Sequence, residues 1–329
     1  KEQRTIDGCD YLLEYPIKGD VALIGAYVAD RMGNLVYRKT ARNFGPVMAT
    51  AAALTIAEVH RVVEIGAIDP EVVVTPGIFV DRVLDLGRDD TANEVPGMSM
   101  IEMGGPVEHL DRGPRSMDEL AAAVAAAIPP GSYVNLGIGQ PTTVADFLAP
   151  ESGVVLHTEN GMLNMGPAAR PDQIDPDLVN AGKMPVTELP GASYFHHADS
   201  FAMMRGGHLD VCVLGAYQVS EGGDLANWHT GVPGAIPAVG GAMDLAIGAK
   251  SVFIMMTLFT KDGPAKLVPR CPYPLTGVGC VDRIYTDYAT IMISHDGAVV
   301  TETFGASVAE LQARVAVTLR APNQASSER

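Results

Sequence analysis

The 329-residue sequence is poor in tryptophan, cysteine and positive charge. It has one Trp and 35 Gly, which favours many tight turns over an aromatic-rich β-sandwich. Its 23 Lys and Arg stand against 39 Asp and Glu, a net charge of −16, so we expect neither nucleic acid nor an anionic membrane as a partner. The four cysteines lack a CxxC spacing, which argues against a zinc ribbon, a dithiol redox site and a secreted chain.

Long apolar runs are absent too. None approaches the roughly 20 residues that a membrane-spanning helix needs, and the first residues precede no signal-peptide core. The composition, 47% hydrophobic and 19% charged, is that of a globular protein. We therefore expect a cytoplasmic protein with no membrane association.

The sequence contains an internal repeat. Residues 20–35 and 210–225 share Asp, Val, Gly, Ala, Tyr, Gly and Leu at a constant offset of 190, and residues 80–83 resemble 281–284. The Gly- and Pro-rich segment 86–115 is the predicted linker between a first domain, 1–85, and a second, 116–329. The first copy has no counterpart of the long stretch before residue 210, so we expect its N-terminal half to come from elsewhere in the same chain or from another chain.

Apolar strands alternate with helices in both copies. Residues 20–27 and 154–158 are typical of buried strands, and residues 132–136 predict a further one. Ser116 and Glu119 form a capping-box pattern that predicts a helix over 117–128, and a second helix is expected over 144–148. The fold class is therefore α/β, with two related units built on open, mostly parallel sheets covered on both faces.

Glu159 follows the strand 154–158 and opens the turn sequence Glu-Asn-Gly. Side chains at the carboxyl ends of strands in open α/β sheets are where ligands bind. A carboxylate there is a nucleophile at neutral pH without a helper base, or it accepts hydrogen bonds from a ligand or a turn. The residue alone does not decide between these roles.

A second motif offers an alternative. Gly137 and Gly139 form a GxG turn after a strand, and Glu159 lies 20 residues beyond Gly139, where a ribose-binding acid would be expected in a dinucleotide-dependent oxidoreductase. Thr142 occupies the third glycine position, however, and Pro141 removes a backbone N–H donor. A tight strand-to-helix turn explains the two glycines equally.

The run Glu159–Pro167, preceded by Thr158, resembles the Ser-Glu-Asn-Gly signature of the class I 3-oxoacid CoA-transferases. Residues 116–300 resemble the β subunit of that family, and residues 11–84 resemble the C-terminal part of the α subunit. Shorter segments carry the match further, at 180–183, 189–195, 199–208, 223–228, 240–245 and 274–277. The similarity is greatest to members that act on 3-oxoadipate or on acetoacetate.

The resemblance implies a fold, a reaction and a site. The fold is the CoA-transferase fold, which is similar to sugar-phosphate isomerases. Glu159 would form a covalent glutamyl-CoA thioester in a ping-pong transfer from an acyl-CoA such as succinyl-CoA to a small 3-oxoacid, and the Gly241 backbone N–H would bind the oxyanion. Coenzyme A is then a co-substrate, and no cofactor is tightly bound. The implied substrate- and CoA-binding residues are Asn160, Gly161, Gly137, Gly139 and Gly240.

Two departures from the family and three alternatives stay open. The α subunit's glycine-rich loop is not in this sequence, and Met256-Thr257-Leu258 stands where relatives carry Met-Glu-His. The alternatives are an acyl-CoA thioesterase, the dinucleotide-dependent oxidoreductase, and a non-catalytic ligand sensor of the same fold. The histidines at 196, 197 and 208 lack the spacing of a metal site, so no metal is expected. A homo-oligomer or an α/β assembly is expected.

Overall fold

The structure is a computed structural model that describes residues 2–88, 113–232, 234, 236–238, 240–295 and 297–321. The chain divides into two compact units. Unit 1 comprises Lys1–Glu94 with Phe195–Ala198, and unit 2 comprises Val95–Tyr194 with Asp199–Arg329. Most of the predicted linker, 86–115, lies outside the described residues, and the domain boundaries stay a prediction.

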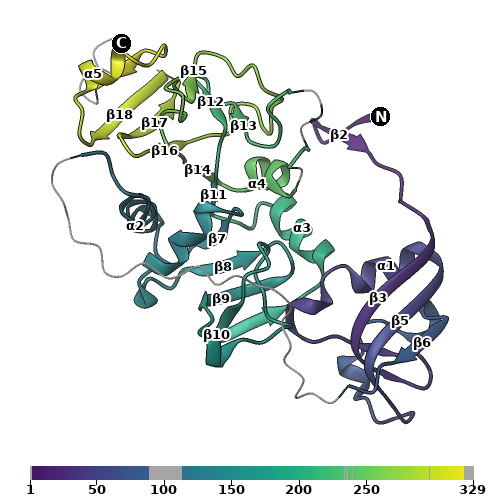
Figure 1. The fold of residues 1–329 in the computed structure, drawn as a ribbon. Helices are drawn as coiled ribbons and strands as arrows, with labels where there is room; N and C mark the ends of the chain where they lie inside the picture. The colour runs from purple at the N-terminus through teal and green to yellow at the C-terminus, as the bar shows by residue number, and fades with distance from the viewer. Residues whose placement is uncertain are drawn as a thin grey trace. The chain divides into compact units, whose positions relative to one another are not determined.

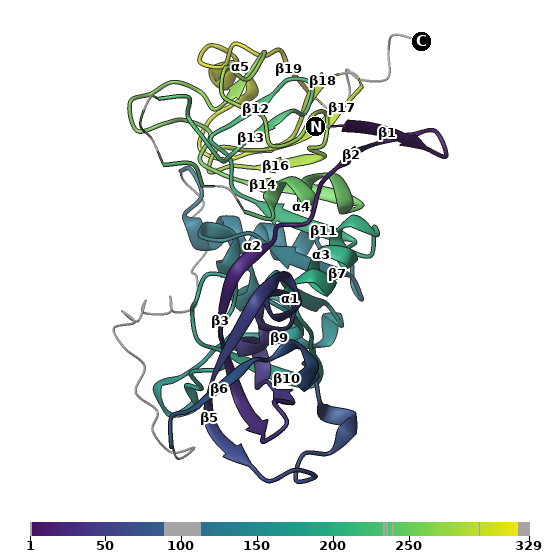
Figure 2. The same ribbon diagram turned by 90° about the vertical axis from the view of Figure 1, so that its right-hand side faces the viewer.

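Unit 1 is built on a four-stranded sheet (Figure 2). Its strands β3 (Gly19–Asp30), β5 (Ala52–Val63) and β6 (Arg82–Asp85) are parallel, and β4 (Leu35–Val36) is antiparallel to the end of β3. Helix α1 (Gly45–Ala51) packs on β3 and β5. A separate hairpin, β1 (Glu2–Ile6) and β2 (Cys9–Leu13), precedes the sheet, and three short 3-10 helices connect its elements: η1 (Lys39–Arg42), η2 (Pro70–Val72) and η3 (Gly77–Phe79).

Unit 2 contains a ten-stranded sheet in the order β10-β9-β8-β7-β11-β14-β16-β17-β18-β19 (Figure 1). The five central strands, β8 to β16 in that order, are parallel, and antiparallel pairs flank them on both sides. The predicted mostly parallel sheet is thus confirmed at the centre. The strands are β7 (Tyr133–Leu136), β8 (Val155–Thr158), β9 (Met162–Ala168), β10 (Val186–Tyr194), β11 (Val211–Leu214), β14 (Ser251–Met255), β16 (Arg283–Tyr285), β17 (Ala289–Ser294), β18 (Gly297–Thr303) and β19 (Leu319–Arg320).

A small second sheet and several helices complete unit 2. The sheet has the order β13-β12-β15. Its strands are β12 (Gln218–Ser220), β13 (Leu225–Ala226) and β15 (Leu267–Val268). The helices are α2 (Met117–Ala127), η4 (Gln140–Phe147), η5 (Pro150–Ser152), η6 (Pro171–Gln173), α3 (His197–Arg205), α4 (Ala242–Gly248) and α5 (Val308–Gln312).

Both faces of the large sheet are buried, as the run of apolar residues in its central strands predicts. Along β11, Val211 and Val213 pack into one hydrophobic cluster with α2, whereas Cys212 and Leu214 pack into another with residues of α4 and α5. Helix α2 begins at the predicted capping box, in which the Ser116 hydroxyl accepts from the Glu119 N–H. No helix among the described residues is long and apolar enough to cross a membrane.

The internal repeat is confirmed by hydrogen bonds that recur at the same offset. The Gly33 N–H donates to the carbonyl of Asp30 at 3.0 Å, and the Gly223 N–H donates to the carbonyl of Ser220 at 3.0 Å. Both glycines adopt positive φ, 86° and 81°, which explains why the repeat keeps glycine there. The two units therefore build the same turn at the same point of the same parallel sheet.

The second shared segment, residues 80–83 and 281–284, has an equally local purpose. An Asp carboxylate oxygen accepts a backbone N–H from the neighbouring strand in each unit, from Thr55 to Asp81 and from Val252 to Asp282, both at 2.7 Å. The acid thus fixes the start of the third parallel strand against the second.

The units differ at one face of the first strand. Val211 and Val213 on β11 are 2% and 0% exposed, because β7 and α2 cover them, but the equivalent Val21 and Leu23 on β3 are 51% and 71% exposed. The expectation of a buried strand over 20–27 is therefore wrong for these two side chains. Among the described residues of unit 1, no counterpart of β7 or α2 covers β3.

Candidate active site

Glu159 lies in a tight loop at the end of a central strand of unit 2. Strand β8 pairs with β7 in parallel and with β9 in antiparallel fashion, and residues 159–161 connect β8 to β9. The Gly161 N–H donates to the carbonyl of Thr158 at 3.1 Å, and Gly161 has φ 110°, a conformation that disfavours side chains. The Asn-Gly sequence after the acid thus forces a turn that leaves Glu159 at the carboxyl edge of the parallel sheet.

The Glu159 carboxylate meets the backbone of Gly241. The Gly241 N–H donates a hydrogen bond to this carboxylate. A Cβ atom on Gly241 would lie 2.5 Å from Glu159 Oε2 and 3.4 Å from Cζ of Phe201, so no side chain fits there. Gly241 has φ −69° and ψ 0°, which any residue can adopt, so space rather than backbone conformation requires glycine. Two predicted site residues from segments 82 positions apart are therefore in contact.

Burial raises the pKa of the half-buried Glu159 above its ordinary value. The Gly241 N–H opposes this shift, whereas the negative charge of Asp244 on α4 adds to it. Asp244 accepts from Nε of Arg205 at 2.6 Å, so a cation stands on its far side. The carboxylate of Glu159 is thus less well solvated than a surface carboxylate, which strengthens it as a nucleophile once it is ionised.

A buried histidine stands two residues before Glu159. His157 is 2% exposed, and its ring joins Asn135 on β7 to Ser200 on α3: Nδ1 is 2.9 Å from Asn135 Nδ2 and Nε2 is 3.0 Å from Ser200 Oγ. Burial lowers the pKa of His157 to about 4, so the ring is neutral at neutral pH.

Asn160 offers an acceptor beside Glu159. Its Nδ2 donates to the carbonyl of Val179 at 2.8 Å, which fixes the side chain. Its Oδ1 is buried and has no hydrogen-bond partner among the described residues. A buried acceptor without a partner costs free energy, so this atom is suited to accept an N–H or O–H of a bound molecule.

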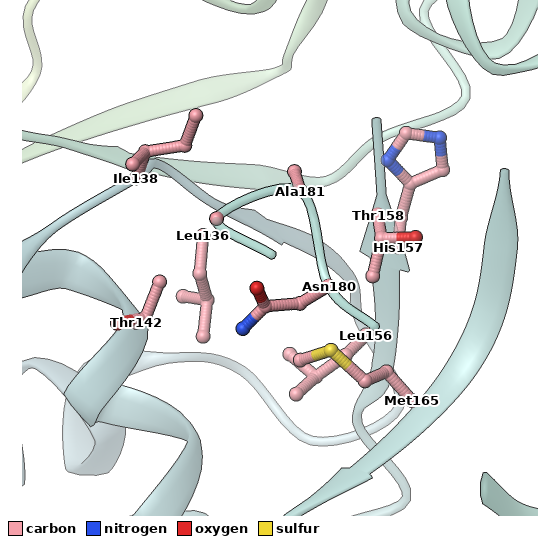
Figure 3. A pocket seen from close by; sticks show the side chains of 10 residues that line it. Leu136, Ile138, Thr142, Leu156, His157, Thr158, Met165, Asn180 and Ala181 are labelled. Atoms are coloured by element: carbon pink, nitrogen blue, oxygen red, sulfur yellow. The ribbon is translucent and has the colours of Figure 1, made fainter. Parts of the chain in front are cut away.

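A pocket opens next to the Glu159 strand. Figure 3 shows the side chains of Leu136, Leu156, Met165 and Asn180 turned toward one another, with the ring of His157 at the edge of the group. The lining is mostly apolar: Leu136, Ile138, Thr142, Leu156, His157, Thr158, Met165, Asn180, Ala181 and Gly182. It suits an apolar or weakly polar group better than a charged one.

The GxG turn has a packing explanation. A Cβ at Gly137 would lie 3.0 Å from the carbonyl oxygen of Val213, so this glycine permits β7 to approach β11. Gly139 adopts φ 91° and opens η4, a 3-10 helix that replaces the α-helix expected over 144–148. A dinucleotide phosphate would need the N-terminus of an α-helix at this turn. Gly240, by contrast, is exposed, and a Cβ there would meet open space.

The departure at 256–258 also has a structural explanation. Leu258 is fully buried in the hydrophobic core, and its N–H donates to Asp287 Oδ1 at 2.7 Å. Thr257 uses its hydroxyl on the carbonyl of Phe259 at 2.9 Å. In this chain the segment serves packing. Among the residues that the structure describes, no group of three or more His, Cys, Asp or Glu side chains is placed to hold a metal ion.

Three residues near the site carried no sequence signal of their own. Asn135, Ser200 and Phe201 sit within a strand and a helix, and nothing in their spacing connects them with Glu159. An Asn in an otherwise apolar strand is the one hint, because a polar side chain in a buried strand needs a partner.

Comparison with known proteins identifies the family. The chain matches the coenzyme A transferase family over residues 1–86 and 117–304. The chain belongs to this family. Both predicted copies lie within the match, as does the contact between Glu159 and Gly241.

Individual relatives match different parts of the chain. One of the two kinds of subunit of the 3-oxoadipate CoA-transferase of Pseudomonas putida KT2440 is 62% identical over 187 residues, which are 57% of this chain and 87% of the relative. The human mitochondrial succinyl-CoA:3-ketoacid coenzyme A transferase 2 is 43% identical over 291 residues, 88% of this chain but 55% of the relative.

A solved structure shares the fold across both units. The acyl-CoA transferase YdiF of Escherichia coli O157:H7, in a thioester complex with CoA, superposes with a TM-score of 0.74 at 19% identity and covers 97% of this chain. This chain spans 64% of the YdiF chain and about half of the human relative.

His157 makes the stability of unit 2 depend on pH. Its pKa of about 4 in the folded protein lies below the ordinary 6.5, so its contribution is fully present above pH 6.5 and is lost as the pH falls toward 4. Between pH 7.5 and 5 this loss is about 2 kcal/mol. Urea unfolding followed by the fluorescence of the single Trp, Trp228, should show it.

The matched variant is His157→Leu, which removes the titrating ring and leaves all carboxylates in place. We expect its free energy of unfolding to fall by about 2 kcal/mol less over the same pH range than that of the wild type. An identical pH dependence in the two proteins would show that His157 is not held neutral by burial.

Proposed function

We propose that this protein transfers coenzyme A from an acyl-CoA, such as succinyl-CoA, to a 3-oxoacid, with Glu159 as the covalent nucleophile. The observation that carries the proposal is the pairing of a half-buried carboxylate with the Gly241 N–H at the carboxyl edge of the sheet. CoA is a co-substrate, and no tightly bound cofactor is required.

A carboxylate is suited to this chemistry because no proton has to be removed from it. A Glu159 oxygen attacks the thioester carbonyl and displaces the CoA thiolate, which leaves an acyl-glutamyl anhydride. The thiolate then attacks the Glu159 carbonyl and expels the acid product as a carboxylate, which leaves a glutamyl-CoA thioester. The carboxylate of the acceptor acid reverses the two steps, so charge and atoms balance without an added base.

Gly241 has a role in the steps that occur at Glu159 itself. When CoA attacks the Glu159 carbonyl, negative charge develops on the carboxyl oxygen of that residue. The Gly241 N–H already points at this carboxyl group, so it is placed to donate to the oxyanion. Asn160 Oδ1 and Gly161 lie beside it, and we propose that Asn160 accepts a hydrogen bond from the bound substrate.

The substrate class rests on the relatives and on the pocket. The relatives are named for 3-oxoadipate and for succinyl-CoA with a 3-ketoacid. The pocket beside β8 is lined chiefly by apolar side chains, with Thr142 and Asn180 as polar groups, which suits a short acyl chain. Which 3-oxoacid is accepted depends on groups that this pocket does not supply.

We further propose that an α-type segment completes unit 1 in the working enzyme. In unit 2, β7 pairs with β11 through Val134 and Val211, and α2 covers the same face. The equivalent Val21 and Leu23 of β3 are exposed. A helix and a strand of the same kind, from the same polypeptide or from a separate subunit, would bury them. The Pseudomonas relative is itself named as one subunit of its enzyme, which is consistent with an α/β assembly.

The covalent step is the direct test of the function. The complete enzyme is incubated with succinyl-CoA or acetoacetyl-CoA and its intact mass is measured, then borohydride reduces the thioester and the modified peptide is mapped. We expect a CoA-sized adduct, with the modification on the peptide that contains Glu159. Glu159→Gln should form none, because an amide is a poor nucleophile.

The other possible functions give different results in this experiment. A thioesterase forms the adduct but releases free CoA when no acceptor acid is present. A ligand sensor binds acyl-CoA without an adduct, and Glu159→Gln leaves its affinity unchanged. An intact complete enzyme that forms no adduct contradicts the proposed function.

Gly241→Ala is expected to separate activity from stability. The new methyl group collides with the end of the Glu159 side chain, which can swing away at little cost, so the free energy of unfolding should change by less than about 1 kcal/mol. A displacement of the nucleophile by about 1 Å should lower the rate of adduct formation about 100-fold. Wild-type rates in Gly241→Ala would show that the contact is not needed.

Leu23 tests the completion of unit 1. In the complete enzyme, hydrogen exchange of the backbone amides on the free edge of β3 should be slow, as expected for a paired strand. Leu23→Asp places a charge where the α-type segment packs and should speed this exchange by at least about tenfold, whereas Leu23→Ile should not. Exchange at the rate of an unstructured chain in the wild-type complete enzyme would contradict the proposal.

A further inference from the structure

We propose that Asn135, His157 and Ser200 form a positioning network that fixes the last two peptide groups of β8 and so holds Glu159 against Gly241. The inference rests on the proposed function, since it takes Glu159 as the nucleophile. None of the three side chains is required for the chemistry itself, and all three are buried, at 3%, 2% and 0% exposure.

The hydrogen-bond directions in this network are determined by its two ends. Asn135 Nδ2 lies 2.9 Å from Nδ1 of His157 and donates to the backbone carbonyl of His157 at 3.2 Å. An amide turned the other way would set its oxygen against that carbonyl, two acceptors face to face, so Nδ2 is the atom that points there. Nδ1 of His157 is therefore the acceptor, and its proton is on Nε2.

The other end follows from this tautomer. His157 Nε2–H donates to Ser200 Oγ at 3.0 Å, which leaves the Ser200 hydroxyl proton to donate to the carbonyl of Thr158 at 3.3 Å. Every donor that these three side chains use in the network then meets an acceptor. Neutrality of His157 is required for this, because a proton on Nδ1 would face the Nδ2 donor of Asn135.

The network ends on the peptide groups that carry Glu159. The carbonyl of His157 is held from β7, and the carbonyl of Thr158 is held both from α3 and by the Gly161 N–H. The backbone immediately before Glu159 is thus fixed from both sides of β8. Glu159 has only its own side-chain torsions left to define.

The same helix also approaches the opposite side of the contact. Phe201 follows Ser200 on α3, and its Cζ lies 3.4 Å from the position of a Cβ on Gly241. Consecutive residues of α3 therefore contact the strand that carries the nucleophile and the glycine that donates to it. A purely apolar core would fill this space without directional bonds, and burying polar groups there costs free energy unless all are paired.

The test measures single-turnover formation of the glutamyl-CoA adduct in the complete enzyme. Ser200→Ala should lower the maximal rate about 10- to 100-fold, because the nucleophile is misplaced, while the acyl-CoA concentration at half-maximal rate changes less than about twofold. His157→Gln keeps an amide N–H near the position of Nε2, so it should retain more activity than His157→Leu, which has a similar volume and no polar group.

Ser220→Ala is the matched control. Ser220 is also a buried serine in unit 2, 2% exposed, but its hydroxyl accepts from the Asp224 N–H in the small sheet. This variant should lose stability, measured by urea unfolding, without loss of the adduct rate. A structural role for Ser200 would give the same pattern as Ser220.

The outcomes separate this inference from the proposed function. Adduct formation in Glu159→Gln would overturn the function and, with it, the network's purpose. No adduct in Glu159→Gln together with a wild-type rate in Ser200→Ala would overturn the network alone. Equal rates in His157→Gln and His157→Leu would do the same, because the directional bond to Ser200 would then have no effect.

Discussion

The close approach of Gly241 to the Glu159 carboxylate is the constraint on which the rest of unit 2 depends. The site has room for a carboxyl group and a backbone N–H but not for a Cβ between them, which would lie 2.5 Å from the carboxylate oxygen. Strand β8 must therefore end at a fixed height, and α4 must begin at a fixed point opposite it. The hairpin loop 159–161, the buried His157 and helix α3 all serve that registration.

Burial acts on two titrating groups of this site in opposite directions. It raises the pKa of Glu159 and lowers that of His157, because in each case the charged form is the one that loses hydration. The two effects serve one arrangement. A poorly solvated carboxylate is a better nucleophile, and a neutral imidazole keeps the hydrogen bonds that hold it. No metal or basic side chain is needed to activate the acid.

The repeat gives the two units one plan and different completeness. The same turn glycine and the same strand-capping Asp recur in both, yet β3 exposes the side chains that β11 buries. A sheet built on this plan is stable only when a further helix and strand cover that face. Unit 1 is for this reason the natural place for the second component of the enzyme, which the comparison with longer relatives also suggests.

The sequence by itself determined the α/β class, the repeat, the capping box of α2, the turn after Glu159 and the identity of the nucleophile's signature, because each depends on residues close together in the chain. Tertiary structure alone decided that Gly241 reaches Glu159, that Gly137 is a packing glycine, that η4 is a 3-10 helix, and that Asn135, His157 and Ser200 form one network. Those facts depend on which strands become neighbours and how closely they pack. Local pattern does not encode such distances, since the same Asn, Ser or Gly is compatible with many partners until the sheet order is fixed.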